Sequence, residues 1–191
     1  MFYRFGRILL TVIFLLAFGV EFLLAQPEKQ SGFHAEEPVL ITSAGQSADV
    51  LMVKLLAQKA GLKFIFEKLA TPGMVDSVKS VILVCGGSSK GLGAARIDKE
   101  QEFKRIQNIL QSAEKKKIPV IGIHVGGKSR RGKLSDYFNQ PVAEKADYLI
   151  VVKEGNRDGF FSKIATGNKI PIQLPEKIIA IQNILKEIYG K

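Results

Sequence analysis

The sequence predicts one α/β domain built on an open, doubly wound sheet of five to six mostly parallel strands, of the Rossmann-like or flavodoxin-like kind. Short apolar runs alternate with amphipathic segments from Pro38 to the C-terminus, which is the pattern of strands joined by helical crossovers. Six runs are too few for an eight-stranded barrel, and 191 residues leave room for one ordinary domain. By analogy with such folds we expect the strand order 2-1-3-4-5, with a sixth strand at one edge.

The first 25 residues have the pattern of a secretory signal. Arg4 and Arg7 precede an apolar run from Ile8 to Val20, and polar residues follow Ala25. The run is shorter than the roughly 20 residues that a spanning helix needs. We expect cleavage after Ala25, with an uncleaved membrane anchor as the alternative because Leu23 is large for its place before the cut. On either reading the domain is exported, to the periplasm or the cell exterior.

The segment that follows the signal is polar and reads as a tether. Residues 26–37 include Pro27, Gly32 and several charges, so we expect the single domain to occupy residues 38–191.

The chain is basic, with 28 Lys and Arg against 18 Asp and Glu and a net charge of +10. Loss of residues 1–25 removes Arg4, Arg7 and Glu21 and leaves +9. Such a surplus is compatible with an anionic ligand, an anionic membrane surface or solubility alone. We expect no nucleic-acid partner, and a membrane contact only through the N-terminal segment if it is retained. The sequence does not predict an oligomeric state.

Strands are expected where short apolar runs lie between turn residues. The runs are Val39–Ile41, Lys63–Glu67, Val81–Val84, Val120–Val125, Tyr148–Val152 and Ile170–Leu174. The third run is apolar throughout, as in a central parallel strand that is covered on both faces. The only cysteine, Cys85, follows it directly, so we expect a core residue and no internal disulfide.

Helices are expected between these runs. Their ranges are Ser47–Ala60, Asp98–Lys117, Ser135–Ala143, Asp158–Ala165 and Glu176–Tyr189, with a turn or short helix over Pro72–Ser80. The first should bury Val50, Leu51, Val53, Leu55 and Leu56 and end at Gly61. The second begins with Asp98 and Gln101 at capping-box spacing.

Polar residues and glycines are concentrated after the strands, at what should be the carboxyl edge of the sheet. Ligands bind at this edge in open α/β sheets. Glycine allows close approach of backbone N–H groups, and cations favour phosphate or carboxylate, so we predict a small anionic or polar ligand. The candidate ligand-binding residues are Gln46, Ser47, Gly87, Ser88, Ser89, Lys90, Gly91, Gly93, His124, Arg130, Arg131 and Asn156. The sequence does not identify a cofactor. It predicts no metal site, because the second histidine, His34, lies in the tether.

Structural explanations compete with this interpretation. The loop Gly86–Gly93 can be a turn that needs positive φ, His124 a satisfied imidazole, and the basic residues 128–133 a solvated face. Their common place at one edge favours a binding domain. A hydrolase or transferase with Ser47 as nucleophile, His124 as base and Asp49 or Asp158 as orienting group is the alternative, although no G-x-S-x-G occurs. A protein-interaction module of the envelope, marked by an exposed apolar patch, is the third hypothesis.

One loop resembles the G-x-x-x-G-x-G nucleotide loop of short-chain dehydrogenases, with Gly87, Gly91 and Gly93 in register. The motif follows the third strand instead of the first, no Tyr-x-x-x-Lys follows it, and the next strand ends at His124 instead of an acidic residue. The compartment to which an exported protein is delivered also lacks nicotinamide cofactor. We interpret this similarity as coincidental.

A longer resemblance covers residues 38–190. It includes the segments Ser43–Ser47, Gly86–Gly93, Ile121–Gly127, Arg130–Gly132, Ala146–Val152 and Glu154–Gly159. The chain resembles a family of exported bacterial proteins classed as a domain of unknown function, which implies an exported α/β domain and no particular activity.

Overall fold

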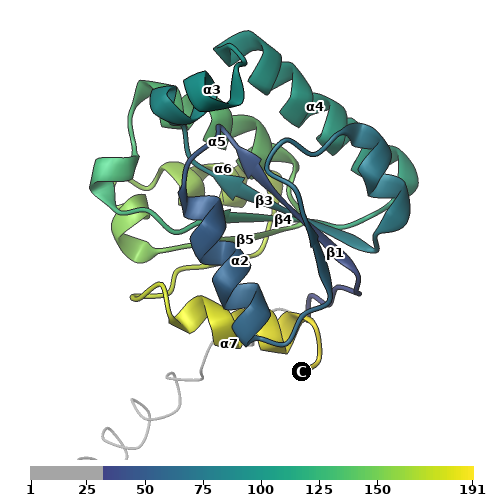
Figure 1. Cartoon of the computed structure of the whole chain (residues 1–191). Coiled ribbons are helices and arrows are strands. Elements are labelled where there is room, and N and C mark those ends of the chain that lie inside the picture. The colour runs from purple at the N-terminus through teal and green to yellow at the C-terminus, as the bar shows by residue number, and fades with distance from the viewer. Residues whose placement is uncertain (1–31) are drawn as a thin grey trace, which may run out of the picture. The chain divides into compact units, whose positions relative to one another are not determined.

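A computed structural model describes residues 32–191, and the compact unit runs from Phe33 to Lys191 (Figure 1). The predicted signal or anchor, residues 1–25, and the first half of the predicted tether, residues 26–31, lie outside the described residues. Between residues 32 and 191, no helix has the length and hydropathy needed to cross a bilayer.

Strands and helices alternate along this unit. The strands are β1 (Val39–Ala44), β2 (Phe64–Phe66), β3 (Ser80–Cys85), β4 (Val120–His124), β5 (Tyr148–Val151) and β6 (Ile172–Gln173). The α-helices are α2 (Asp49–Lys59), α3 (Ser89–Ala95), α4 (Lys99–Lys116), α5 (Lys133–Lys145), α6 (Phe160–Asn168) and α7 (Ala180–Ile188). Short 3₁₀ helices cover Pro72–Ser77, Lys128–Arg130 and Lys153–Asn156.

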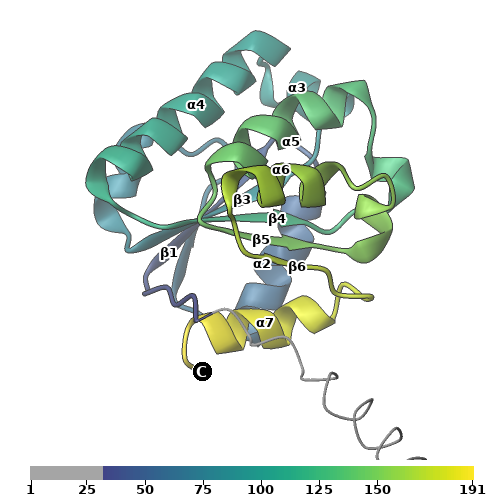
Figure 2. The ribbon, with the colours of Figure 1, turned by 180° about the vertical axis from the view of Figure 1, so that it is seen from behind.

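All strands are parallel, in the order β2-β1-β3-β4-β5-β6. This confirms the predicted fold class and strand order. The connection from β1 runs toward β2, whereas the connections from β3 and β4 run the other way. Right-handed crossovers therefore place α2 on one face of the sheet and α4 and α5 on the other (Figures 1 and 2). The order in which the strands are added reverses between β1 and β3, and ligands bind at such a switch point in open α/β sheets.

The two faces of the sheet carry two hydrophobic clusters, both drawn from residues 33–191. One cluster packs β-strand side chains such as Leu83 against α4, α5 and α6. The other packs residues such as Ile82 against α2 and α7. Every residue of β3 is buried, which confirms that it is central. Both clusters lie within the compact unit Phe33–Lys191.

The predicted buried stripe of α2 is wrong in two positions. Val50, Val53 and Leu56 are buried, but Leu51 and Leu55 are 51% and 44% exposed. The helix contacts the protein along one side only, and positions 51 and 55 lie about 100–160° away from 50 and 53 around its axis.

The glycine-rich segment is also more regular than predicted. Its first part is a loop, but Ser89–Ala95 form the helix α3, whose N-cap is Ser88. The Ser88 hydroxyl accepts the N–H of Gly91 at 3.0 Å, which stabilises the first turn.

Packing begins before Pro38. The ring of Phe33 stacks on Tyr148 with centroids 4.8 Å apart, and the N–H of Ala35 donates to the carbonyl of Ile188 at 3.0 Å. The end of the predicted tether is therefore part of the packed unit.

Candidate functional site

The structure joins the loops after β1 and β3 at the point where the order of the strands reverses. Gln46 and Gly87 form an isolated antiparallel bridge. The N–H of Ser47 donates to the carbonyl of Gly86 at 3.2 Å, and the N–H of Ser88 donates to that of Gly45 at 2.9 Å. The two loops that carry many of the predicted site residues are thus joined through backbone hydrogen bonds.

Gln46 holds this unit in an uncommon conformation. Its φ is +60°, whereas the other positive-φ residues besides glycine between 32 and 191 are C-caps of helices: Arg96, Lys117 and Lys169. The side chain is 3% exposed, and its Nε2 donates to the Lys68 carbonyl at 3.2 Å and to Glu102 at 3.1 Å. Gln46 therefore fixes the loop rather than facing solvent.

Glu102 is the centre of this arrangement and is absent from the predicted site. Its carboxylate is fully buried, and Oε1 accepts the N–H of Gly45 at 2.8 Å as well as the Gln46 amide. Arg105 donates to both carboxylate oxygens at 2.8 Å, and to the carbonyls of Ser43 and Ala70. A charged pair thus supports the β1–α2 loop from beneath.

A signal for Glu102 exists in the sequence. Glu102, Ile106, Ile109 and Ala113 follow the 3.6-residue period, and all four are buried. The periodicity places a carboxylate on the buried face of α4, where it needs partners.

The glycines of the β3–α3 segment serve close packing. A Cβ on Gly91 would lie 1.9 Å from the Gln46 carbonyl oxygen, and one on Gly87 would lie 2.8 Å from the backbone of Leu134. Gly93 has open space around it. Ser89 and Lys90 are exposed on the outside of α3.

His124 is buried at the end of β4, with no exposed surface. Its Nδ1 lies 3.1 Å from the carbonyl oxygen of Cys85, so Nδ1 carries the proton and Nε2 is left as an acceptor. Nε2 has no hydrogen-bond partner. Burial lowers the pKa of His124, which keeps the imidazole neutral.

The Arg131 side chain forms hydrogen bonds with other groups of the protein. Its guanidinium donates to Asp136 at 2.6 Å, to Asp158 at 3.1 Å and to the carbonyl of Gly155 at 2.5 Å, and it lies 4.5 Å from the Phe160 ring centroid. Burial would raise the pKa of Asp158, but the hydrogen bonds from Arg131 outweigh this and lower it. Arg131 therefore joins the loops after β4 and β5 instead of facing a ligand.

Arg130, in contrast to Arg131, is largely exposed to solvent. Its side chain is 54% exposed, and its Nε lies 3.9 Å from Asp49 Oδ1. It lies against Gly126, where a Cβ would come within 2.3 Å of the Arg130 Cβ and 3.4 Å of the His124 ring. Arg130, Asp49 and His124 are therefore neighbours on the carboxyl edge.

Asn156 is a structural residue of the β5–α6 loop. Its Oδ1 accepts the N–H groups of Phe161 and Ser162 at 3.0 and 3.2 Å, and its Nδ2 donates to the Ser162 hydroxyl at 2.5 Å. These bonds satisfy the free N–H groups at the start of α6.

Ser47 and Asp49 lie over Gly86. Ser47 is 2% exposed, and its hydroxyl accepts the N–H of Asp49 at 3.2 Å. Asp49 Oδ2 is buried without a partner, 3.5 Å from the position a Cβ on Gly86 would take. No hydrogen bond within residues 32–191 joins Ser47 to His124, and His124 Nδ1 faces a backbone carbonyl rather than an acidic side chain. Ser47 and His124 therefore do not have the hydrogen-bonded arrangement of a nucleophile and its general base.

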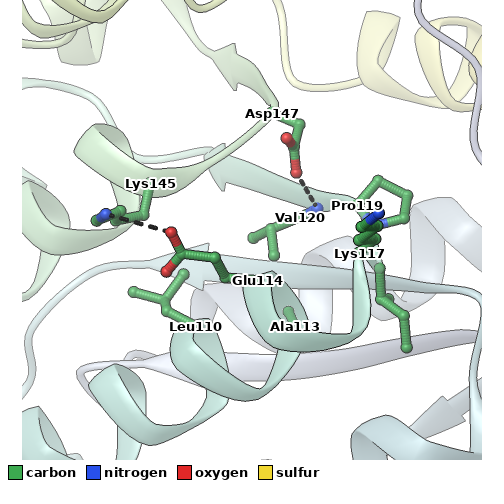
Figure 3. A pocket seen from close by; sticks show the side chains of 9 residues that line it. Leu110, Ala113, Glu114, Lys117, Pro119, Val120, Lys145 and Asp147 are labelled. Carbon is green, nitrogen blue, oxygen red and sulfur yellow. Dashed lines mark hydrogen bonds and ion pairs between the residues drawn. The ribbon is translucent and has the colours of Figure 1, made fainter.

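A well-formed hollow lies at the opposite edge of the sheet, where the sequence shows only simple connections. It encloses about 380 Å³ beside the end of α4, with Leu110, Ile118 and Val120 in its lining (Figure 3). Glu114 and Lys145 approach to 3.8 Å at its side. Glu114 and Lys145 are thus paired with each other, and Asp147 accepts the N–H of Val120 at 2.8 Å.

The family of the chain can now be stated. Residues 36–189 match the family described as Domain of unknown function (DUF6305). The chain belongs to this family. That confirms the family resemblance seen in the sequence. No curated protein matches the chain.

Solved structures resemble this DUF6305 domain only distantly. A mutant of the esterase AlinE4 has a TM-score of 0.32 at 11% identity, covering 75% of this chain and 77% of the esterase. A GDSL-like lipase from Bacteroides thetaiotaomicron has a TM-score of 0.32 at 15% identity, covering 70% of this chain and 65% of the lipase. An archaeal fructose 1,6-bisphosphate aldolase has a TM-score of 0.27 at 14% identity, covering 72% and 73%.

Proposed function

We propose that the chain is an extracytoplasmic binding domain for a small polar or anionic ligand, which contacts Ser47, Asp49, His124 and Arg130 at the carboxyl edge of the sheet. The observation that carries the proposal is the pair of buried acceptors without partners, Asp49 Oδ2 and His124 Nε2, beside the exposed cation of Arg130. The export of the domain rests on the signal-like pattern of residues 1–25.

The chemistry of these groups defines the ligand class. A buried acceptor without a hydrogen bond costs about 1–3 kcal/mol, which a ligand hydroxyl or amine can recover. Arg130 is joined at this edge by the exposed side chains of Lys90 and Lys128, so a phosphate or carboxylate has cations to face. A small molecule with both a donor group and an anionic group fits best.

The binding hypothesis fits the geometry better than the hydrolase hypothesis does. Ser47 donates nothing to His124, and its hydroxyl already accepts the Asp49 N–H. A neutral, fully buried imidazole with one nitrogen on a carbonyl can accept a hydrogen bond from a ligand without any step of proton transfer.

Thermal unfolding of residues 26–191 against phosphate, sugar phosphates, carboxylates and amino acids tests the proposal. A ligand at about 100 times its Kd stabilises the fold by roughly 2.7 kcal/mol, which raises Tm by about 5–10 °C at this size. We expect Asp49→Asn and Arg130→Ala to abolish the shift. Arg157→Ala is the matched control, because Arg157 is an exposed arginine on the neighbouring loop.

Two results would contradict the proposal. One is the absence of a shift with every compound of the panel. The other is a shift that survives unchanged in Asp49→Asn and Arg130→Ala, which would place the ligand elsewhere on the domain.

A further inference from the structure

The solvent-facing side of α2 is apolar. Leu51, Met52 and Leu55 are 51%, 41% and 44% exposed. They lie at positions i, i+1 and i+4, so they are neighbours on one side of the helix. We refer to these three residues as the apolar face of α2. Lone exposed leucines are ordinary, but adjoining ones on a short helix mark an interaction surface.

Exposed apolar side chains are unevenly distributed over residues 33–191. The two other large ones, Leu174 and Ile179, are 38% and 56% exposed and precede α7, which covers the same side of the sheet as α2 (Figure 1). Among the described residues, α3, α4, α5 and α6 carry none. The side of the domain that carries α2 and α7 therefore exposes more large apolar side chains than the side that carries α4, α5 and α6.

The surroundings of this face are basic. From Val50 to Lys63 the chain carries Lys54, Lys59 and Lys63 and no acidic residue. Lysine beside exposed leucine and methionine on one helix is the composition of segments that rest on anionic membranes. A basic patch near such a surface adds roughly 1 kcal/mol of attraction per cation.

The covalent chain limits how far Phe33 can lie from a membrane that holds the N-terminal apolar segment. Phe33 packs on Tyr148 in the same cluster that α2 and α7 cover. The apolar segment of the sequence ends at Ala25, eight residues before Phe33. An extended chain of that length spans at most about 29 Å. On the alternative reading, in which the apolar segment is an uncleaved anchor, the bilayer lies within that distance of Phe33.

We propose that the apolar face of α2 binds the surface of an anionic bilayer. Leu51, Met52 and Leu55 enter the boundary between headgroups and acyl chains, and the exposed Lys59 and Lys63 face the lipid phosphates, whereas the Lys54 ammonium lies over the Phe66 ring. This contact is separate from the carboxyl-edge ligand site and does not depend on it.

Co-sedimentation of residues 26–191 with vesicles tests the contact without the apolar N-terminal segment. The vesicles contain equal parts of phosphatidylglycerol and phosphatidylcholine, and a second set contains phosphatidylcholine alone. We expect binding to the anionic set and weaker binding to the neutral set. The double variant Leu51→Ser/Leu55→Ser should lower the partition coefficient at least about ten-fold, since each leucine offers half its side chain.

The control is the double variant Gln107→Ser/Gln111→Ser, two exposed positions at the same spacing on α4, which should bind as the unaltered domain does. The leucine double variant should unfold at an unchanged temperature, because both leucines are exposed in the native state. The proposal is overturned if the unaltered domain stays in the supernatant, or if the leucine double variant binds equally well. It is also overturned if the domain forms dimers that the leucine double variant abolishes, since a second copy would then cover the face.

Discussion

Replacing Glu102 by alanine tests how the β1–α2 loop is held. The change leaves the Arg105 guanidinium, 12% exposed, without its carboxylate, and it leaves the Gly45 N–H and the Gln46 amide without their shared acceptor. Breaking a buried pair by removing one partner costs about 3–5 kcal/mol. At 2–4 °C per kcal/mol for a domain of this size, the expected fall in Tm is roughly 10 °C.

The measurement is urea and thermal unfolding of Glu102→Ala beside the matched control Glu100→Ala. Glu100 lies on the same helix, but it is exposed and pairs only with the exposed Lys99, so its loss should cost less than about 0.5 kcal/mol. The double variant Glu102→Ala/Arg105→Ala should cost less than the sum of the single variants, because it removes the stranded cation.

The reasoning is refuted if Glu102→Ala unfolds within about 0.5 kcal/mol of Glu100→Ala. Such a result would mean that water or a rearranged loop satisfies Arg105, Gly45 and Gln46 as well as the carboxylate does.

Three further predictions concern buried or crowded positions. Burial lowers the pKa of His124 from 6.5, so below pH 6.5 the unfolded chain binds the proton first and the free energy of unfolding falls, by at most about 1.4 kcal/mol per pH unit. Urea unfolding at pH 7.5 and 5.5 should show this loss in the unaltered domain and less of it in His124→Gln; equal losses would contradict the assignment. Gly91→Ala puts a Cβ 1.9 Å from the Gln46 oxygen and should destabilise by about 1–3 kcal/mol, whereas Gly93→Ala in the same helix meets nothing and should stabilise by about 0.5–1 kcal/mol; similar effects would argue against the packing role. Burial raises the pKa of Cys85 to about 12, so a thiol reagent at pH 8 should label it only after unfolding, and rapid labelling of the native domain would disprove its burial.

Local patterns in the sequence were sufficient to predict the strands of the sheet. The apolar runs predicted the six strands of residues 32–191, most clearly β1, β3, β4 and β5, because a parallel strand covered on both faces is apolar along its whole length. The start of α4 was equally clear, since Asp98 and Gln101 form the capping box with bonds of 2.7 and 2.9 Å. Both features depend on residues close together in the chain.

The candidate site was predicted less completely because it depends on partners far apart in the chain. Arg130 and Arg131 are adjacent and look alike in sequence, yet one is exposed and the other is enclosed by Asp136 and Asp158. Glu102 lies 57 residues from Gly45, its hydrogen-bond donor. No local pattern contains such information, whereas the position of the carboxyl edge follows from topology alone.

The strain at Gln46 connects the support beneath the loop to the site above it. A residue other than glycine at φ +60° costs about 1–2 kcal/mol, and here the bonds to Glu102 and Lys68 offset that cost. The left-handed turn directs the chain so that Ser47 and Asp49 come to lie over Gly86. These side chains are therefore in place before any ligand arrives, and binding need not include the entropy of ordering the loop. A loop built this way is expected of a domain that recognises a small ligand, because few contacts are available and each must be made without reorganisation.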